Sequence, residues 1–157
     1  MGTVIQLSVS QGGVPKLAVD SAEVTATGVV GDAQRDTRTH GGPERAVCIY
    51  SADLIAALRA EGHPIAPGAV GENVTVEGIE WEAVTPEARL EFEGGVVLEV
   101  ASYTTPCSAI RGSFLQGQIA RINQNERPGW SRVYARVLKP GRIRVGDRVE
   151  IIVGPGA

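Results

Sequence analysis

The sequence has few aromatic residues, no long apolar run and only two cysteines. Aromatic residues make up 4% of the 157 residues. No stretch reaches the roughly 18 consecutive apolar residues that indicate a membrane-spanning helix. The first residues, Met1–Ser10, lack the basic region followed by an apolar core that a secretory signal requires. We therefore expect a soluble cytoplasmic protein with no membrane partner.

The two cysteines, Cys48 and Cys107, form neither a disulfide framework nor a CxxC motif. A single bridge between them is one alternative, but a reducing cytoplasm favours two free thiols. Together with His40 and His63 they lack the spacing of a zinc site. A cysteine cluster for an iron–sulfur centre is also absent. Any metal chemistry would therefore depend on one cysteine rather than on a cluster.

Charge of one sign does not dominate the chain. There are 15 Lys and Arg residues against 18 Asp and Glu residues, which gives a net charge of −3. The charges form no block, so neither nucleic acid nor an anionic membrane surface is indicated as a partner. The length is typical of one domain, and we assign residues 1–157 to a single domain.

Glycine and proline are frequent, with 20 and 9 residues, which favours many short strands joined by turns. Alternating polarity in Ala88–Glu93 and the apolar run Val96–Tyr103 flank Gly94-Gly95 and predict a hairpin. A second hairpin is predicted at the C-terminal end, from Arg132–Leu138 and Arg142–Ile152. The pattern predicts a mainly β, β-rich α+β fold, a closed or nearly closed β-barrel.

Two or three short helices are expected beside the barrel. Ser51 is a suitable N-cap for a helix that Gly62 would end. A further helical segment is predicted from Pro106 to about Gln124, interrupted by glycines.

Cys107 is the strongest candidate for chemistry. It follows an apolar strand, with Thr105 as a possible N-cap and Pro106 at the first helical position. A cysteine in the first turn of a helix is stabilised as a thiolate, which is the form that ligates soft metals or accepts sulfur. The alternative is a small buried hydrophobic residue. Core packing is the better interpretation for Cys48, which lies inside the apolar run Arg45–Tyr50.

A glycine-rich loop carries a second group of candidates. His40 precedes Gly41 and Gly42, whose main-chain amides could approach a ligand closely. Arg35 and Arg38 lie just before them and could bind a phosphate. In isolation the alternative, solvated loop charges, is slightly favoured for these residues.

Two further segments carry polar residues that suit a ligand. Glu72 and Asn73 follow a loop rich in proline and glycine and could hydrogen-bond the edge of a heterocycle, or simply form a turn. Trp130 and Arg132 lie near the C-terminal segment, where the indole could stack on a ring or cover one end of the barrel.

The order of these motifs resembles the MOSC family, named for the C-terminal domain of molybdenum-cofactor sulfurases. The motifs are Gly31-Asp32, HGGPERAV at His40–Val47, Tyr50, PGAVGEN at Pro67–Asn73, Pro106-Cys107, RPGWSRVYARVL at Arg127–Leu138, and Gly146-Asp147. The resemblance extends from about Thr3 to Val153. It implies a β-barrel-like fold with a pocket that holds the family cysteine.

The resemblance implies that Cys107 ligates the molybdenum of the pterin cofactor, molybdopterin, and is catalytic together with His40. It also maps His40 with Gly41 and Gly42, and Glu72 with Asn73, onto the pocket motifs of the family, and Trp130 onto its C-terminal motif. If the cofactor binds, Arg35, Arg38 or Arg132 is expected to hold its phosphate, and His40 or Glu72 to shuttle protons. The expected cofactor-binding residues are thus Arg35, Arg38, Gly41, Gly42, Glu72, Asn73, Trp130 and Arg132. In small bacterial members the expected substrates are N-hydroxylated bases. In sulfurase relatives the domain delivers sulfur.

Two departures from the family pattern bear on function. Many cofactor-binding relatives carry an arginine shortly before the Pro-Cys pair, where this chain has Thr104 and Thr105. The chain also lacks the pyridoxal-phosphate domain of the sulfurases, so an electron-donor or sulfur-donor protein is expected to act in trans.

Three functions are compatible with these residues. The first is a molybdenum-dependent oxidoreductase that reduces N-hydroxylated small molecules, with Cys107 as the metal ligand. The second is a sulfur or cofactor carrier, without turnover of its own, in which Cys107 holds a persulfide. The third is an inactive β-barrel binding module, which the Thr104-Thr105 departure favours. Whether the protein is an enzyme stays open at this point.

Overall fold

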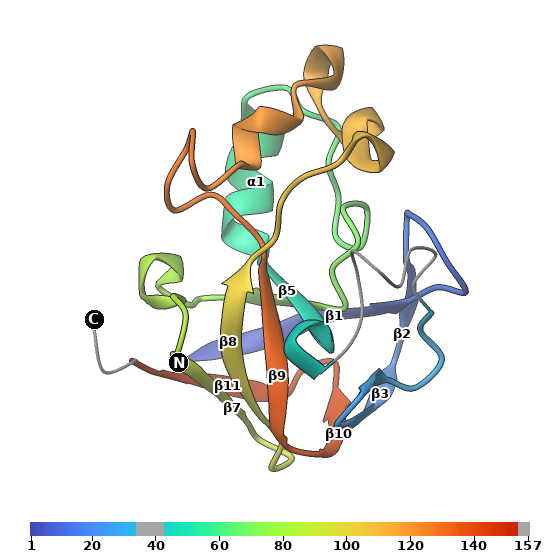
Figure 1. The fold of residues 1–157 in the computed structure, drawn as a ribbon, viewed down its shortest axis with the longest axis vertical. Helices are drawn as coiled ribbons and strands as arrows, with labels where there is room; N and C mark the ends of the chain where they lie inside the picture. The colour runs from blue at the N-terminus through green and yellow to red at the C-terminus, as the bar shows by residue number, and fades with distance from the viewer. Residues whose placement is uncertain (34–42, 154–157) are drawn as a thin grey trace.

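The main sheet of the protein closes on itself to form a barrel (Figure 1). The computed structural model describes residues 1–33 and 43–153. Around the barrel the strands run in the order β1 (Gly2–Val9), β11 (Arg148–Ile152), β7 (Arg89–Phe92), β8 (Val97–Tyr103), β9 (Val133–Lys139), β5 (Val47–Ser51) and β6 (Val74–Glu77). β6 then pairs with β1, which closes the ring, and β2 (Leu17–Val19) extends outward from β1. The predicted closed β-barrel is confirmed.

A smaller sheet packs beside the barrel and alters the connection expected at the C-terminal end. It consists of β10 (Gly141–Arg144), β3 (Ser21–Thr25) and β4 (Gly28–Val29). β9 pairs with β8 and β5, β10 pairs with β3, and β11 pairs with β7 and β1. The predicted C-terminal hairpin is therefore wrong. The main-chain amide of Val145 donates to the carbonyl of Asp20, and Gly146 has a positive φ of 96°. This turn separates β10 from β11 and sends them to different sheets.

The helix α1 (Ala52–Ala60) forms where the sequence predicts it. The Ser51 hydroxyl accepts a hydrogen bond from the Leu54 amide at 3.2 Å, as an N-cap does. Ile55 and Leu58 are buried against the barrel, and Gly62, with a φ of 102°, lies just beyond the end of the helix. Ile55 and Leu58 are three positions apart and therefore lie on one face of the helix, and this spacing is what predicts a helix from the sequence.

The predicted helix over 106–124 is replaced by three separate 3-10 turns. These are η3 (Ser108–Ser113), η4 (Leu115–Gly117) and η5 (Ile119–Ile122). Phe114 is extended between the first two, and Gln116 and Gly117 have positive φ angles of 53° and 66°. An α-helix cannot continue through such residues. The remaining 3-10 turns in the described residues are η1 (Pro43–Arg45) and η2 (Trp81–Ala83).

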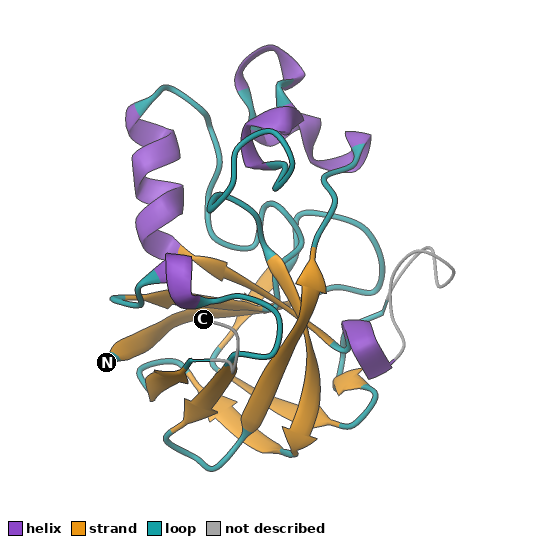
Figure 2. Ribbon diagram, turned by 60° about the vertical axis from the view of Figure 1, so that its left-hand side comes forward, coloured by secondary structure: helices purple, strands orange, loops and turns teal. Residues whose placement is uncertain are grey.

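α1 and the turns η3 to η5 lie together beyond one end of the barrel (Figure 2). β8 ends, and β9 begins, at that same end (Figure 1). Apolar side chains fill the barrel, among them the fully buried Val4, Leu90 and Leu98. No helix in the described part of the chain is both long enough and apolar enough to cross a bilayer.

Candidate functional site

The strand register places three polar segments around Ile49 on β5. Ile49 on β5 lies opposite Val133 on β9 and alongside Val74 on β6. Tyr103, the last residue of β8, also lies opposite Val133. Thr104 after β8 and Arg132 before β9 therefore lie next to each other, on the side of these pairs that leads to α1. Glu72 and Asn73 precede β6 on the opposite side, because β6 runs parallel to β5, and the Arg132 side chain reaches their loop through its bond to the Val70 carbonyl.

Arg132 is buried, with 5% of the residue exposed. Its Nη1 donates to the main-chain carbonyl of Val70 at 2.6 Å. Its Nε and Nη2 have no hydrogen-bond partner in the structure. An unpaired buried donor costs about 1–3 kcal/mol, and more when it is charged. This arginine therefore keeps one edge of its guanidinium available.

Glu72 is fully buried beside Arg132. Its Oε2 accepts a hydrogen bond from the Thr75 hydroxyl at 3.2 Å, while Oε1 has no partner in the structure. Burial raises the pKa of this carboxyl above its ordinary value of 4.5. The amides of Gly68 and Glu72 and the charge of Arg132 act in the opposite direction. Glu72 thus holds a proton to a higher pH than an exposed glutamate does.

Thr104 is the member of this group that sequence reasoning treated only as a departure from the family pattern. It is 3% exposed, and its hydroxyl faces the Cys48 thiol, where it acts to lower the pKa of that thiol against the larger effect of burial. Its main-chain amide donates to the Arg132 carbonyl at 3.0 Å, and its carbonyl accepts from the Ser131 hydroxyl at 3.2 Å. These bonds extend the β8–β9 ladder by one pair and turn the side chain inward.

Both the oxygen and the nitrogen of the Asn73 side-chain amide make hydrogen bonds within the protein. Its oxygen accepts from the main-chain amide of Cys48 at 3.0 Å. Its Nδ2 donates to the Ser8 carbonyl at 3.2 Å and to Asp32 Oδ2 at 3.0 Å. Asp32 is also paired with Lys16 at 2.7 Å. The structure thus gives Asn73 a bracing role beside Glu72, whereas the sequence predicts a cofactor contact.

The two cysteines differ in environment, as the sequence predicts. Cys48 is 4% exposed, and its burial raises the pKa of the thiol to about 11. Cys107 is exposed and free. It caps η3 in an extended conformation with φ of −125°, outside the turn, because no α-helix begins at Pro106. The helix-dipole argument for a Cys107 thiolate therefore does not apply in this structure.

Tyr134 is a buried tyrosine whose pKa is affected by both thiols and by Arg132. It lies opposite Cys48 in the β5–β9 ladder and is 6% exposed. Burial raises the pKa of its hydroxyl, and the thiols of Cys48 and Cys107 act in the same direction, while the positive charges of Arg132 and Arg45 lower it. Both thiols are therefore within electrostatic range of this one phenol. Cys107 is exposed and follows the buried Thr104 along the chain, whereas Cys48 is buried.

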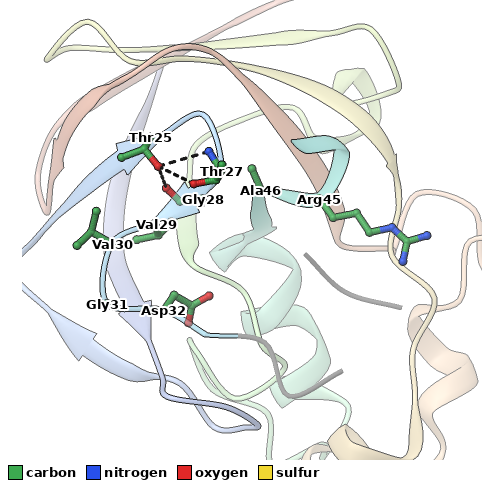
Figure 3. A pocket seen from close by; sticks show the side chains of 9 residues that line it. All are labelled: Thr25, Thr27, Gly28, Val29, Val30, Gly31, Asp32, Arg45 and Ala46. Carbon is green, nitrogen blue, oxygen red and sulfur yellow. Dashed lines mark hydrogen bonds between the residues drawn. The ribbon is translucent and has the colours of Figure 1, made fainter. Parts of the chain in front are cut away.

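Arg45 also lines a pocket at the surface of the protein. It has a volume of about 210 Å³ and is lined by the turn Thr25–Asp32 together with Arg45 and Ala46 (Figure 3). The Arg45 guanidinium carbon is 5.5 Å from the centre of the Tyr134 ring. The pocket therefore borders the same region of the barrel as Tyr134.

Trp130 packs against Arg121. The guanidinium carbon lies 3.9 Å from the indole centre, and Glu61 holds the arginine through two bonds of 2.9 and 2.7 Å. The indole also lines a groove with Leu54 and Trp81. The remaining predicted site residues, Arg35, Arg38, His40, Gly41 and Gly42, lie outside the described residues.

The sequence of the chain matches the family model described as "MOSC domain" over residues 36–150. The chain belongs to the MOSC domain family. YflK of Bacillus subtilis, a MOSC relative, is 32% identical over 124 residues, which cover 78% of this chain and 54% of YflK. A protein from Gibberella moniliformis named "Reductase" is 34% identical over 136 residues, which cover 83% of this chain and 24% of that protein. The chain thus spans less than two thirds of each of these curated relatives.

The solved structure of YiiM from Geobacillus stearothermophilus has the same fold. It superposes with a TM-score of 0.73 at 21% identity, covering 97% of this MOSC chain and 75% of YiiM. At this identity the likeness shows the fold alone. MOSC domains are associated with binding of the molybdenum cofactor.

The residues of this MOSC domain fit such a cofactor. A soft metal prefers a thiolate ligand, and Cys107 supplies an exposed thiol. A polar ligand needs hydrogen-bond donors, and Arg132 Nε and Nη2 are buried donors without a partner in the structure.

Proposed function

We propose that this MOSC domain binds the molybdenum cofactor through Cys107 and reduces N-hydroxylated small molecules. One observation carries the proposal. Cys107 carries an exposed, free thiol shortly after Thr104, whose main chain is bonded to that of the buried Arg132. The family match and the relative named "Reductase" are consistent with it.

Each residue has a distinct task in this proposal. Cys107 ligates molybdenum, and Glu72 and Arg132 hold the pterin part of the cofactor. From the sequence we also expect Arg35 and Arg38 to bind the phosphate of the cofactor. His40, Gly41 and Gly42 are expected to line the pocket. When bound, the cofactor supplies two-electron chemistry. An N-hydroxyl group takes up two electrons and two protons, loses water and leaves an N–H group.

Protons and electrons reach the site by different routes. Glu72 holds a proton on its buried carboxyl to a higher pH than usual, because burial raises its pKa. It is therefore suited to deliver a proton to the substrate oxygen. The electrons come from a donor protein in trans, which docks near the exposed Cys107.

Metal content tests this function directly. The full chain is purified from a host that makes the cofactor, and molybdenum and pterin are measured per chain. We expect near-equimolar molybdenum in the wild type and less than about a tenth of it in Cys107→Ala, because the ligand is lost. Ser108→Ala alters an exposed neighbour of Cys107 and should keep the metal. A wild-type protein without molybdenum, or a Cys107→Ala variant that retains it, would contradict the proposal.

Persulfide transfer is the second candidate, and the exposure of Cys107 favours it. A surface thiol can be reached by the cysteine of a sulfur donor, such as a pyridoxal-phosphate-dependent desulfurase. In this case the intact mass of the protein should rise by one sulfur atom in the presence of the donor. The addition should be removed by a reductant and be absent in Cys107→Ala. An unchanged mass in the wild type would eliminate this candidate.

A further inference from the structure

A groove of about 450 Å³ opens at the N-terminal end of α1, and the proposed cofactor chemistry does not use it. Three segments line it, namely the start of α1, the η2 turn and the loop that leads into β9. η2 lies next to the N-terminal end of α1 in both views of the fold (Figure 1, Figure 2). Neither Cys107 nor the buried residues Glu72 and Arg132 line this groove.

Much of the groove lining is apolar and aromatic. It includes both tryptophans of the chain, Trp81 and Trp130, together with Leu54 and Ile79. Trp81 and Ile79 are buried, whereas Leu54 and Trp130 are partly exposed. Such a surface can receive the hydrocarbon part of a ligand, and the indole rings also attract positive charge.

Hydrogen bonds hold the segments of both tryptophans in place. Trp81 Nε1 donates to the Ser131 carbonyl at 2.9 Å, and the Tyr50 hydroxyl donates to the Trp130 carbonyl at 2.7 Å. The Arg121 guanidinium covers the Trp130 ring, with its carbon 3.9 Å from the ring centre. A ligand therefore meets a lining that is already ordered, which lowers the entropic cost of binding.

The polar part of the lining is acidic. Asp53, Glu80 and Glu82 line the groove, and all three are exposed. Asp53 lies in the first turn of α1, where it offsets the positive end of the helix dipole, and its Oδ2 accepts from the Gly78 amide at 2.8 Å. In the described part of the chain these three carboxylates form no ion pair, and no lysine or arginine lines the groove. The groove therefore attracts a cation and repels an anion.

We infer that this groove is the docking site for a basic segment of a partner protein, which inserts an arginine or lysine side chain. The hydrocarbon stem of that side chain packs on Leu54 and Trp130, and its charged head meets Glu80 and Glu82. Tryptophan surrounded by polar side chains is typical of the residues that dominate protein–protein binding. The exposed carboxylates favour a protein segment over a small cation, because small-molecule sites bury most of their ligand. This docking site requires neither molybdenum nor Cys107.

The two tryptophans make the groove observable without a label, because the chain has no others. The full chain is titrated with the acetylated and amidated peptide Leu-Arg-Ala-Leu-Arg-Ala while tryptophan emission is followed. The matched probe carries citrulline, the uncharged isostere of arginine, at both arginine positions. We expect the arginine peptide to shift the emission and to bind at least about fivefold more tightly than the citrulline peptide. The difference should shrink at about 1 M salt, which screens exposed charges.

A double variant assigns the binding to the groove. Glu80→Gln combined with Glu82→Gln should weaken binding of the arginine peptide about threefold or more and leave the citrulline peptide unaffected. The matched control combines Glu91→Gln with Glu150→Gln. These two exposed glutamates lie opposite each other in the β7–β11 pair and do not line the groove. The control changes the net charge equally and should bind both peptides as the wild type does.

Several results would overturn the docking site. They are equal binding of the two peptides, no change in emission up to about 1 mM arginine peptide, or unchanged binding by the Glu80→Gln, Glu82→Gln variant. If N-acetylarginine amide bound as tightly as the peptide, the groove would be a site for a small cation, and the protein partner would be refuted. All these results are independent of molybdenum content, which the comparison with Cys107→Ala tests separately.

Discussion

Cys48 and Asn73 are joined by a reciprocal pair of hydrogen bonds. The Cys48 amide donates to the Asn73 side-chain oxygen at 3.0 Å, and the Asn73 amide donates to the Cys48 carbonyl at 2.8 Å. The pair ties the start of β6 to β5 directly beside Glu72. The geometry of the polar site therefore depends on an asparagine whose side chain bonds to the protein itself.

Asn73→Ala should destabilise the protein substantially. The substitution removes three side-chain hydrogen bonds and leaves the buried Cys48 amide without an acceptor. We expect the free energy of unfolding to fall by about 2–4 kcal/mol, since each net hydrogen bond contributes about 1 kcal/mol. Urea denaturation measures it. Asn125→Ala, at an exposed position, is the control and should change stability by less than about 0.5 kcal/mol. Equal stability of the two variants would refute the bracing role.

The ion pair between Lys16 and Asp32 should contribute far more than the surface pairs. Its side chains are only 4% and 6% exposed, at a separation of 2.7 Å. Lys16→Met would remove the buried ammonium group that bonds both Asp32 carboxylate oxygens, at a cost of about 3–5 kcal/mol. The control is Arg142→Met, because Arg142 and Glu23 are 45% and 56% exposed and 4.0 Å apart. That variant should lose no more than about 1 kcal/mol in the same urea titration. A smaller loss for Lys16→Met than for the control would contradict this prediction.

The barrel could be predicted from the sequence because its signals are local. Alternation in Ala88–Glu93 and the Gly94-Gly95 turn specify their hairpin without information from distant segments. The partner of a strand is different, because it depends on the whole sheet. The segment Arg142–Ile152 shows the limit, since a turn at Gly146 divides it between two sheets. An alternating pattern predicts strands, but it does not say which strands pair.

The candidate site could be predicted only in part. Cys107 stands out by its position after a strand, and Glu72 by its loop. Thr104 has no local signal, because nothing in the Thr104-Thr105-Pro106 segment shows which of the two threonines is buried. Its inward direction follows from one further β8–β9 pair with Arg132, a contact between residues far apart in the chain. Such contacts become visible only when the strands have been paired.

The two thiols should differ greatly in reactivity towards iodoacetamide. Cys107 is exposed, whereas burial raises the pKa of Cys48 to about 11. At pH 8 only about one Cys48 thiol in a thousand would be ionised, and the reagent cannot reach it in the folded protein. We expect Cys107 to be alkylated at least about 100-fold faster, as followed by peptide mass spectrometry. Both cysteines should react after unfolding in urea. Comparable rates in the native protein would place Cys48 at the surface and contradict its burial.

Glu72→Gln should make the protein more stable than the wild type at neutral pH and not in acid. The folded protein raises the pKa of the Glu72 carboxyl above its ordinary value of 4.5, mainly through burial. Below that value the carboxyl is protonated in both the folded and the unfolded chain, so its ionisation does not affect stability. As the pH rises past 4.5, the unfolded chain loses the proton first, and the wild type loses stability until the folded carboxyl ionises as well.

The glutamine variant cannot ionise, so it escapes this loss. The difference in unfolding free energy between Glu72→Gln and the wild type should therefore grow in favour of the variant from about pH 4.5 upward, and level off above the folded pKa. Urea titrations at half-unit intervals from pH 4 to 8 measure this difference. Glu126→Gln changes an exposed glutamate and should stay within about 0.5 kcal/mol of the wild type throughout. If the difference were constant with pH, Glu72 would ionise alike in both states. If it grew in favour of the wild type, the attraction of Arg132 would outweigh burial. Either result would remove the argument that Glu72 holds a proton for delivery to the substrate.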